Sequence, residues 1–318
     1  MVKFVLWVLL LSIANWSLAE GLRINQLQFV GSHNSYKKAM LPEHRAALEA
    51  LDPQAAAALA YAHIPLDEQL DSGIRKLELD LFYEPGSDDF VVGHIQVIDM
   101  QTHCATLRTC LRQLKSWSLL NPGHIPVWIS FNAKDSAVEG LPDPHLFDPV
   151  AFSSLDTLLV EELGLKLILP QMILTDNGPV WPYIDAVRGT FLVVLDEGGR
   201  KRELYLESDK HRVMFTTVAP PHRAAAIQII NDPISDFSLI QSRVRAGYMV
   251  RTRADANTLE ARIPDTVRRD KAFASGAQAI STDYYQDSNP FQTGYSVKPV
   301  IACNPVTGLT CSTDQAIE

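Results

Sequence analysis

Eight short apolar segments, separated in several places by stretches with helical spacing, constrain the fold of this chain most strongly. Each is rich in Val, Ile, Leu or Phe, as expected of strands in a buried parallel sheet. The segments are residues 26–30, 73–82, 126–131, 190–195, 212–216, 226–230, 248–253 and 278–282. Helical patterns occur at residues 43–62, with a break at Pro53, and at 66–70, 107–120, 152–163 and 265–274. This alternation predicts an α/β fold, a (β/α)8 barrel of the TIM type.

The first 19 residues have the pattern of a secretory signal peptide. Lys3 provides a positive start, residues 4–13 are apolar, and residues 17–19 form a small-x-small cleavage site. The apolar run is too short to span a membrane comfortably, and we expect no transmembrane segment. We therefore expect an exported protein, secreted or periplasmic, in which residues 20–318 form a single barrel domain.

Four cysteines fall into two close pairs. Because an exported protein meets oxidising conditions, we expect disulfides between Cys104 and Cys110 and between Cys303 and Cys311. Each would close a small loop and contribute roughly 2 kcal/mol, while free buried thiols are the alternative. The second pair lies after Tyr285, in a segment that we expect to be extended and to close the domain.

The net charge of the full chain is −9, and it becomes −10 once Lys3 leaves with the signal peptide (−9 minus +1). Such an acidic chain has no general attraction for nucleic acid or for anionic bilayers. We therefore expect no nucleic-acid partner. A phosphate group bound by this protein must be held locally, by a metal ion or by a few basic side chains.

Two acidic side chains, Glu78 and Asp80, share one face of the predicted strand 73–82. Strand side chains alternate, so these two point the same way, roughly 7 Å apart. Carboxylates are rarely buried unpaired, and the pair needs a cation or several donors to stay ionised. A divalent metal meets that need, while two solvated acids on an exposed face are the alternative.

Other polar residues also follow the predicted strands. Because the strand ends of a barrel meet at one mouth, we expect these side chains to lie together with the two acids. They are His33, Asn34, His94, Asn132, Lys134, Arg251, Arg253 and Asp283.

Four motifs, in this order, identify a family. GSHNSY at 31–36, LELDLF at 77–82, VGH at 92–94 and the run at 250–285 resemble the secreted, calcium-dependent phosphoinositide phospholipase C family. That family belongs with glycerophosphodiesterases and sphingomyelinase D among the barrel phosphodiesterases. The resemblance spans nearly all of the mature chain. It implies Ca²⁺ as cofactor and a phospholipid or phosphodiester substrate. Transient contact with a membrane surface and a soluble, deacylated phosphodiester substrate both stay open.

The resemblance also implies a metal site. Asn34, Glu78 and Asp80 match calcium ligands of the family, and all offer the oxygen donors that calcium prefers. At a fourth ligand position the family usually has an acid two residues before a lysine, but this chain has Asn132 before Lys134. The amide removes one negative charge, which should weaken the metal site or change its preference.

The catalytic histidines of the family match His33 and His94. We assign His94 as the general acid for the leaving alcohol and His33 as a stabiliser of transition-state charge. A calcium-bound Glu78 is the expected general base, and Lys134 adds positive charge beside the phosphate. The predicted reaction cleaves phosphatidylinositol to diacylglycerol and a cyclic inositol phosphate.

Four late residues are candidates for binding the substrate headgroup, although a structural salt-bridge network explains them equally well. They are Arg251, Arg253, Asp283 and Tyr284. The remaining histidines have no comparable neighbours, and we expect them to be surface or core residues; they are His44, His63, His103, His124, His145, His211 and His222.

Two other functions stay open. A glycerophosphodiesterase or a sphingomyelinase-D-like enzyme would share the histidines and acids but would have a different headgroup pocket. A non-catalytic barrel that binds phospholipid headgroups is an alternative of another class, and the change to Asn132 is its only support.

Overall fold

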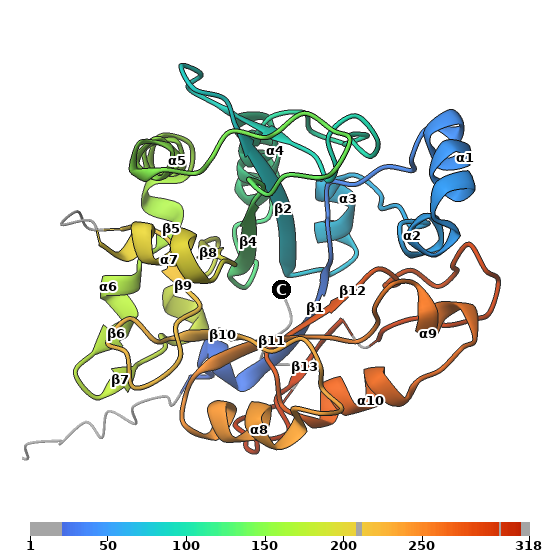
Figure 1. The fold of residues 1–318 in the computed structure, drawn as a ribbon. Helices are drawn as coiled ribbons and strands as arrows, with labels where there is room; N and C mark the ends of the chain where they lie inside the picture. Colours follow the sequence, from blue (N-terminus) through green and yellow to red (C-terminus); the bar gives the residue numbers. More distant parts are fainter. Residues whose placement is uncertain (1–20, 208–211, 299, 313–318) are drawn as a thin grey trace, which may run out of the picture.

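All eight predicted strands form, and they build one curved sheet (Figure 1). The computed structural model describes residues 21–207, 212–298 and 300–312. The predicted signal peptide therefore lies outside the described residues. The eight strands are β1 (Leu27–Ser32), β2 (Lys76–Tyr83), β4 (Val127–Ala133), β8 (Phe191–Leu195), β9 (Phe215–Thr216), β10 (Ile227–Ile229), β11 (Met249–Arg253) and β12 (Ala279–Thr282).

The sheet has the strand order β10-β11-β12-β1-β2-β4-β8-β9, and each of these pairings is parallel. The predicted α/β barrel architecture is confirmed, with one difference. Among the described residues no hydrogen-bonded ladder joins β9 to β10, so the barrel is open between them. β5 (Leu167–Ile168) and β9 pair with the same edge of β8. β5 pairs with the amino-terminal half of β8, and β9 pairs with its carboxyl-terminal end.

Four further strands run antiparallel. One is β3 (Phe90–Val92), which pairs with the end of β2. β13 (Ile301–Cys303) pairs with β1, so the segment after Tyr285 does return to the barrel in extended form. β6 (Leu174–Thr175) and β7 (Gly178–Pro179) form a separate hairpin.

The helices lie outside the curved sheet (Figure 1). The predicted ones are α1 (Pro42–Leu51), α2 (Pro53–Ala58), α3 (Leu66–Asp71), α4 (Leu107–Leu120), α5 (Pro149–Leu163) and α10 (Val267–Ala274). Others that the sequence analysis did not identify are α6 (Pro170–Ile173), α7 (Gly199–Leu206), α8 (Phe237–Arg245) and α9 (Leu259–Arg262). Short 3-10 turns, η1 (Ile24–Gln26), η2 (Gly164–Lys166) and η3 (Ile184–Ala186), complete the fold. No helix within the described ranges is long and apolar enough to cross a membrane.

Pro53 marks the break between α1 and α2, as predicted. Proline cannot donate a backbone hydrogen bond, which suits the first position of a helix. The side chain of Asp52 accepts hydrogen bonds from the backbone N–H groups of Gln54 and Ala55, at 3.0 and 2.9 Å, and so caps α2.

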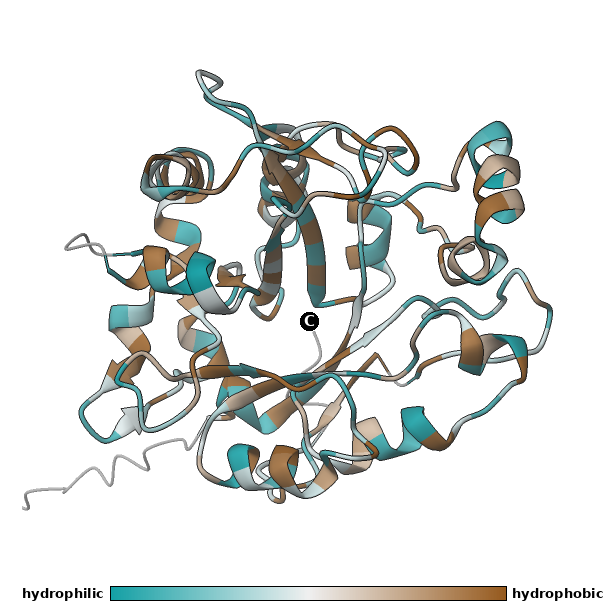
Figure 2. Cartoon of the chain, in the orientation of Figure 1, coloured by the Kyte–Doolittle hydropathy of each residue, from teal (hydrophilic) through white to brown (hydrophobic). Residues whose placement is uncertain are grey.

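Strand β2 separates two layers, as its alternation predicted. Leu77, Leu79 and Leu81 are fully buried against an outer core that includes residues of α3, α4 and α5. Glu78 and Asp80 point to the other side, into the barrel, and the strand is banded brown and teal in Figure 2. A second apolar cluster, which includes side chains of all eight barrel strands except β2, fills the barrel below these acids. The polar residues therefore occupy one end of the barrel interior.

Both predicted disulfides are present. Cys104 is bonded to Cys110 beside the start of α4, and Cys303 of β13 is bonded to Cys311. The second bond ties the last described residues to the strand that pairs with β1.

We predict that His124 makes the protein less stable in acid. The side chain is buried against Trp117 and Phe191, and burial lowers its pKa to about 4. The unfolded chain takes up this proton below pH 6.5, but the folded protein does so only near pH 4. The unfolded state is therefore increasingly favoured as pH falls between those values, by about 3 kcal/mol in total.

The measurement is urea unfolding of wild type and His124→Gln at several values between pH 7 and 4. The variant should lose part of the decline in unfolding free energy. Parallel curves for the two proteins would show that His124 does not contribute to the pH dependence.

Candidate active site

His33 is the first residue after β1, and its partner is Asp283, the first residue after β12. The two strands are paired with Ser32 opposite Thr282, so the following residues are neighbours. The Nδ1–H of His33 donates to Asp283 Oδ1 at 3.1 Å, and Arg253 of β11 places Nη2 3.8 Å from the other carboxylate oxygen. Burial and the charge of Arg253 lower the pKa of His33, outweighing Asp283 and Glu78. The imidazole is thus neutral at pH 7, with Nε2 turned toward the site.

His63 supports this pair, although the sequence analysis placed it among surface or core histidines. It is buried, and its Nε2–H donates to the backbone oxygen of His33 at 2.6 Å. Its ring stacks on Tyr285 at 5.5 Å between centroids. His63 therefore holds the backbone at His33. Nothing in its local sequence signals this role, because the contact joins segments 30 residues apart.

His94 follows β3 and has its own carboxylate partner, Asp99. The Nδ1–H of His94 donates to Asp99 Oδ2 at 3.0 Å, and the other oxygen of Asp99 accepts from Lys37 Nζ at 2.8 Å. Burial alone would raise the pKa of Asp99, but the bonds from His94 and Lys37 outweigh it and lower the pKa. Asp99 therefore stays ionised and fixes the ring of His94 with Nε2 free.

The predicted metal-ligating side chains lie together at the carboxyl ends of β1, β2 and β4. Asp80 and Asn132 are paired residues of β2 and β4. The amide nitrogen of Asn132 lies 2.9 Å from Asp80 Oδ1 and 3.2 Å from Glu78 Oε1. Lys134 Nζ lies 3.1 Å from Asp80 Oδ2. Asn34 is buried close by, in a left-handed turn (φ 45°), and its amide donates to Tyr61 at 2.8 Å.

Glu78 has two further partners, both cations. Lys76 lies two residues earlier on the same face of β2, and its Nζ donates to Glu78 Oε2. Arg251 of β11 donates to the same oxygen at 2.7 Å. Burial would raise the pKa of Glu78, but Lys76 and Arg251 hold it well below its usual value. The sequence analysis missed Lys76, which the alternation used for Glu78 and Asp80 would have placed beside them.

The residues proposed as calcium ligands do not fit a calcium ion as they are arranged. All four carboxylate oxygens of Glu78 and Asp80 already lie within hydrogen-bonding distance of donors in the chain. Three cations, Lys76, Arg251 and Lys134, face these two carboxylates. Among the described residues, no group of three or more His, Cys, Asp or Glu side chains is placed to hold a metal.

Asp135 does not restore the charge that Asn132 lacks. Its carboxylate pairs with Arg200 at 2.6 Å and with Lys201 at 3.2 Å, which ties β4 to α7. Tyr284 is also separate from the site. Its ring lies in the outer core against Phe291 and Tyr295, whereas the neighbouring Asp283 faces the barrel. The structure therefore brings Arg251, Arg253 and Asp283 into the site but not Tyr284.

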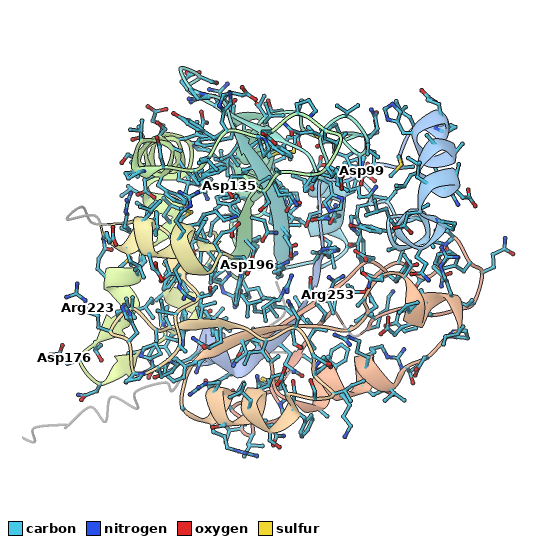
Figure 3. The ribbon with its side chains drawn as sticks, in the orientation of Figure 1. Asp99, Asp135, Asp176, Asp196, Arg223 and Arg253 are labelled. Carbon is cyan, nitrogen blue, oxygen red and sulfur yellow. A yellow bond between two sulfur atoms is a disulfide. The ribbon has the colours of Figure 1, made fainter. Side chains whose placement is uncertain are left out.

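A pocket of about 310 Å³ lies beside these groups. His94, Asn132 and Lys134 line it, with Asp196 and Glu197 from the end of β8. Asp196 lies near the centre of the barrel, opposite Arg253, whereas Asp176 and Arg223 lie at the edge (Figure 3). The pocket thus places a histidine, a lysine and acceptor oxygens around one space that a small phosphodiester can enter.

Two carboxylate-held histidines beside basic side chains at the mouth of a parallel barrel define a phosphodiesterase-type site. The sequence matches the family described as phosphoinositide phospholipase C, Ca²⁺-dependent, over residues 22–92 and 83–305. The chain therefore belongs to this family, and it is a phosphoric diester hydrolase of the phospholipase C type. The comparison with curated protein sequences gives no significant match.

Solved structures share the fold. The calcium-dependent phosphoinositol-specific phospholipase C from the Gram-negative bacterium Pseudomonas sp. is 18% identical, with 89% of this chain and 96% of that chain covered and a TM-score of 0.59. A calcium-dependent phosphatidylinositol-specific phospholipase C from Streptomyces antibioticus is 17% identical, with coverage of 83% and 95% and a TM-score of 0.55. These similarities support the predicted barrel class.

We predict that Asp99→Asn lowers kcat for phosphodiester cleavage by roughly 10- to 100-fold, because His94 loses the carboxylate that orients its ring. Steady-state kinetics would measure this. Since the substitution also removes the partner of buried Lys37, circular dichroism must show a folded variant, and Lys37→Met/Asp99→Asn provides a version without the unpaired charge. Unchanged kcat in both variants would contradict a role for Asp99.

Proposed function

We propose that this protein is an exported enzyme that cleaves phosphatidylinositol between phosphate and glycerol, releasing diacylglycerol and inositol 1,2-cyclic phosphate. The observation that supports this most is the presence of two histidine–carboxylate pairs, His33 with Asp283 and His94 with Asp99, at one end of the barrel. We further propose that residues 1–19 are a signal peptide and that residues 20–318 form one barrel domain.

In the proposed reaction His33 is the general base. Its Nε2 takes the proton of the inositol 2-hydroxyl, and the resulting oxygen attacks phosphorus. The bond from phosphorus to the glycerol oxygen breaks, and that oxygen takes the Nε2 proton of a His94 imidazolium, which keeps its Nδ1–H on Asp99. The two proton transfers balance, so the products are a neutral alcohol and a cyclic phosphodiester.

This assignment differs from the sequence-based one, in which Glu78 is the base and His33 stabilises charge. Lys76 and Arg251 keep Glu78 ionised at a low pKa, which makes it a poor proton acceptor. His33 is neutral and is oriented by Asp283, as a base must be. Lys134, in the pocket wall, supplies positive charge to the phosphate.

Calcium was predicted from the family resemblance, with Asn34, Glu78, Asp80 and Asn132 as ligands. The family description includes calcium, but these residues do not fit the ion in their present arrangement. No step of the proposed reaction therefore uses a metal ion.

The pocket favours a headgroup without extra phosphates. Asp196 and Glu197 line it, but Glu197 is already paired with Lys201 at 2.7 Å. The oxygens of Asp196 suit the hydroxyl groups of an inositol ring, and a ring phosphate placed beside Asp196 would meet like charge. We therefore propose unphosphorylated inositol as the headgroup.

The partner surface is a lipid bilayer, which the enzyme contacts transiently. Val97 lies in the loop between His94 and Asp99 and is 59% exposed, and Val138, in the loop after β4, lines the pocket and is 48% exposed. Two exposed apolar side chains beside the entrance suit shallow contact with lipid. Contact through apolar side chains does not require a net positive charge on the protein.

The first test is release of inositol phosphates from phosphatidylinositol vesicles by the mature protein. Wild type should form the cyclic product, and His33→Ala should lower its rate by about 100-fold or more because the base is lost. His222→Ala, which changes an exposed histidine outside the site, is the matched control and should keep wild-type activity.

Product analysis separates the alternatives. Turnover of glycerophosphoinositol without turnover of the lipid would indicate a glycerophosphodiesterase, and free choline or ceramide phosphate products from other lipids would indicate a sphingomyelinase-D-like enzyme. Headgroup binding without turnover of any of these would support a non-catalytic barrel instead of the proposed enzyme.

The headgroup proposal has its own test. We predict that phosphatidylinositol is cleaved at least about 10-fold faster than phosphatidylinositol 4,5-bisphosphate, because Asp196 repels ring phosphates. Initial rates on mixed vesicles of equal substrate content measure the ratio. Equal rates, or faster cleavage of the bisphosphate, would contradict this role of Asp196.

A further inference from the structure

Lys76 is built into the centre of the site. It is fully buried, and its Nζ contacts three oxygens: Glu78 Oε2, the backbone oxygen of Ser32 at 3.3 Å and Ser281 Oγ at 3.4 Å. These partners belong to β2, β1 and β12. An ammonium group held by three neighbouring strands is a fixed positive charge inside the barrel, since lysine is almost never fully buried without such partners.

The neighbouring strand makes room for this side chain. Gly31 of β1 is paired with Lys76 in the sheet. A Cβ on Gly31 would overlap both Cβ and Cδ of Lys76 and would lie 2.8 Å from its backbone oxygen. Only glycine at position 31 therefore lets the lysine stem lie across the barrel interior.

Arg251 adds a second cation from the opposite side of the same carboxylate. It is 3% exposed, its Nη2 donates to Glu78 Oε2 at 2.7 Å and its Nη1 donates to Asn231. Its Nε–H has no acceptor among the described residues, which leaves one guanidinium donor for a ligand oxygen or water. Two cations thus converge on one oxygen of the Glu78 carboxylate.

The charge balance also disfavours a divalent ion. Glu78 and Asp80 carry two negative charges, and three cations, Lys76, Arg251 and Lys134, already pair with them. Calcium bound at Glu78 Oε2 would displace Lys76 and Arg251, and calcium bound elsewhere on the two carboxylates would place a double positive charge beside both cations. The fully buried ammonium group of Lys76 would then be compensated less by Glu78, with Asp196 as the other acid that acts on its charge. Asn132, which offers no charge, does not offset this cost.

We propose that Lys76 and Arg251 take the place of the calcium ion in this chain and supply its positive charge, so that phosphodiester cleavage here does not require calcium. The inference rests on the proposed function. Glu78 then anchors and orients the two cations instead of binding a metal. The fixed charges stabilise the negative charge that develops on the phosphoryl oxygens during attack.

The direct test uses the wild-type protein. Isothermal titration calorimetry with CaCl2 should show no binding up to millimolar concentration, and the melting temperature should not change with calcium or EGTA. Cleavage of soluble dihexanoyl phosphatidylinositol should be equally fast in EGTA and in calcium. The short-chain substrate avoids calcium effects on anionic vesicles.

Three outcomes are distinguishable. Calcium binding by calorimetry together with activity that EGTA abolishes would overturn the inference and leave the proposed function standing. Activity in EGTA without calcium binding is the expected result. Absence of turnover under both conditions would overturn the proposed function, and the inference with it.

Variants test the two cations separately. Lys76→Met should lower kcat by about 100-fold or more. The matched control is Lys166→Met, which should keep wild-type activity. Lys166 is a part-buried lysine outside the site that donates to Ser118 and to the backbone oxygen of Gly189. Arg251→Lys should retain more activity than Arg251→Met, because charge and not shape is required. If Lys76→Met does not fold, the Arg251 pair and the wild-type calorimetry still decide. Full EGTA-resistant activity in folded Lys76→Met would contradict the role of Lys76.

Discussion

The buried carboxylate of Glu78 is the interaction on which the site depends. An ionised carboxylate inside a protein is tolerated only when paired and hydrogen-bonded, and Glu78 is held by Lys76, Arg251 and Asn132. These partners come from β2, β11 and β4, so Glu78 connects strands from both halves of the sheet. Among the described residues no ladder joins β9 to β10, so the sheet is not closed by hydrogen bonds. Side-chain contacts across the barrel interior, such as those of Glu78, therefore help to hold the curvature of the sheet.

The barrel strands could be predicted because apolar residues make up most of each strand. The alternation of side chains along β2 showed which of its residues face into the barrel. The opening between β9 and β10 was not predictable. Both are strands of two or three residues, and their pairing depends on the loops around them, which carry no periodic signal. Helices α7 and α8 were missed for a related reason. Their strongly polar or short apolar patterns fit a solvated loop as well as a helix.

In the site, sequence reasoning found residues that follow strands and missed those that act through long-range contacts. His33, His94, Glu78 and Asp80 carry motif signals. His63 reaches His33 through a backbone contact, and Asp99, which orients His94, is itself held by Lys37, 62 residues earlier in the chain. Tyr284 shows the opposite error: it follows β12 in sequence, but alternation from Asp283 turns it into the outer core.

Lys76 illustrates how a local rule was applied too narrowly. The two acids of β2 suggested a metal because carboxylates on one face need positive charge. The same alternation places Lys76 on that face, two residues before Glu78. Gly31 of the neighbouring strand leaves the space that the Lys76 side chain requires. The electrostatic requirement was therefore identified correctly, while the group that meets it lies in the chain.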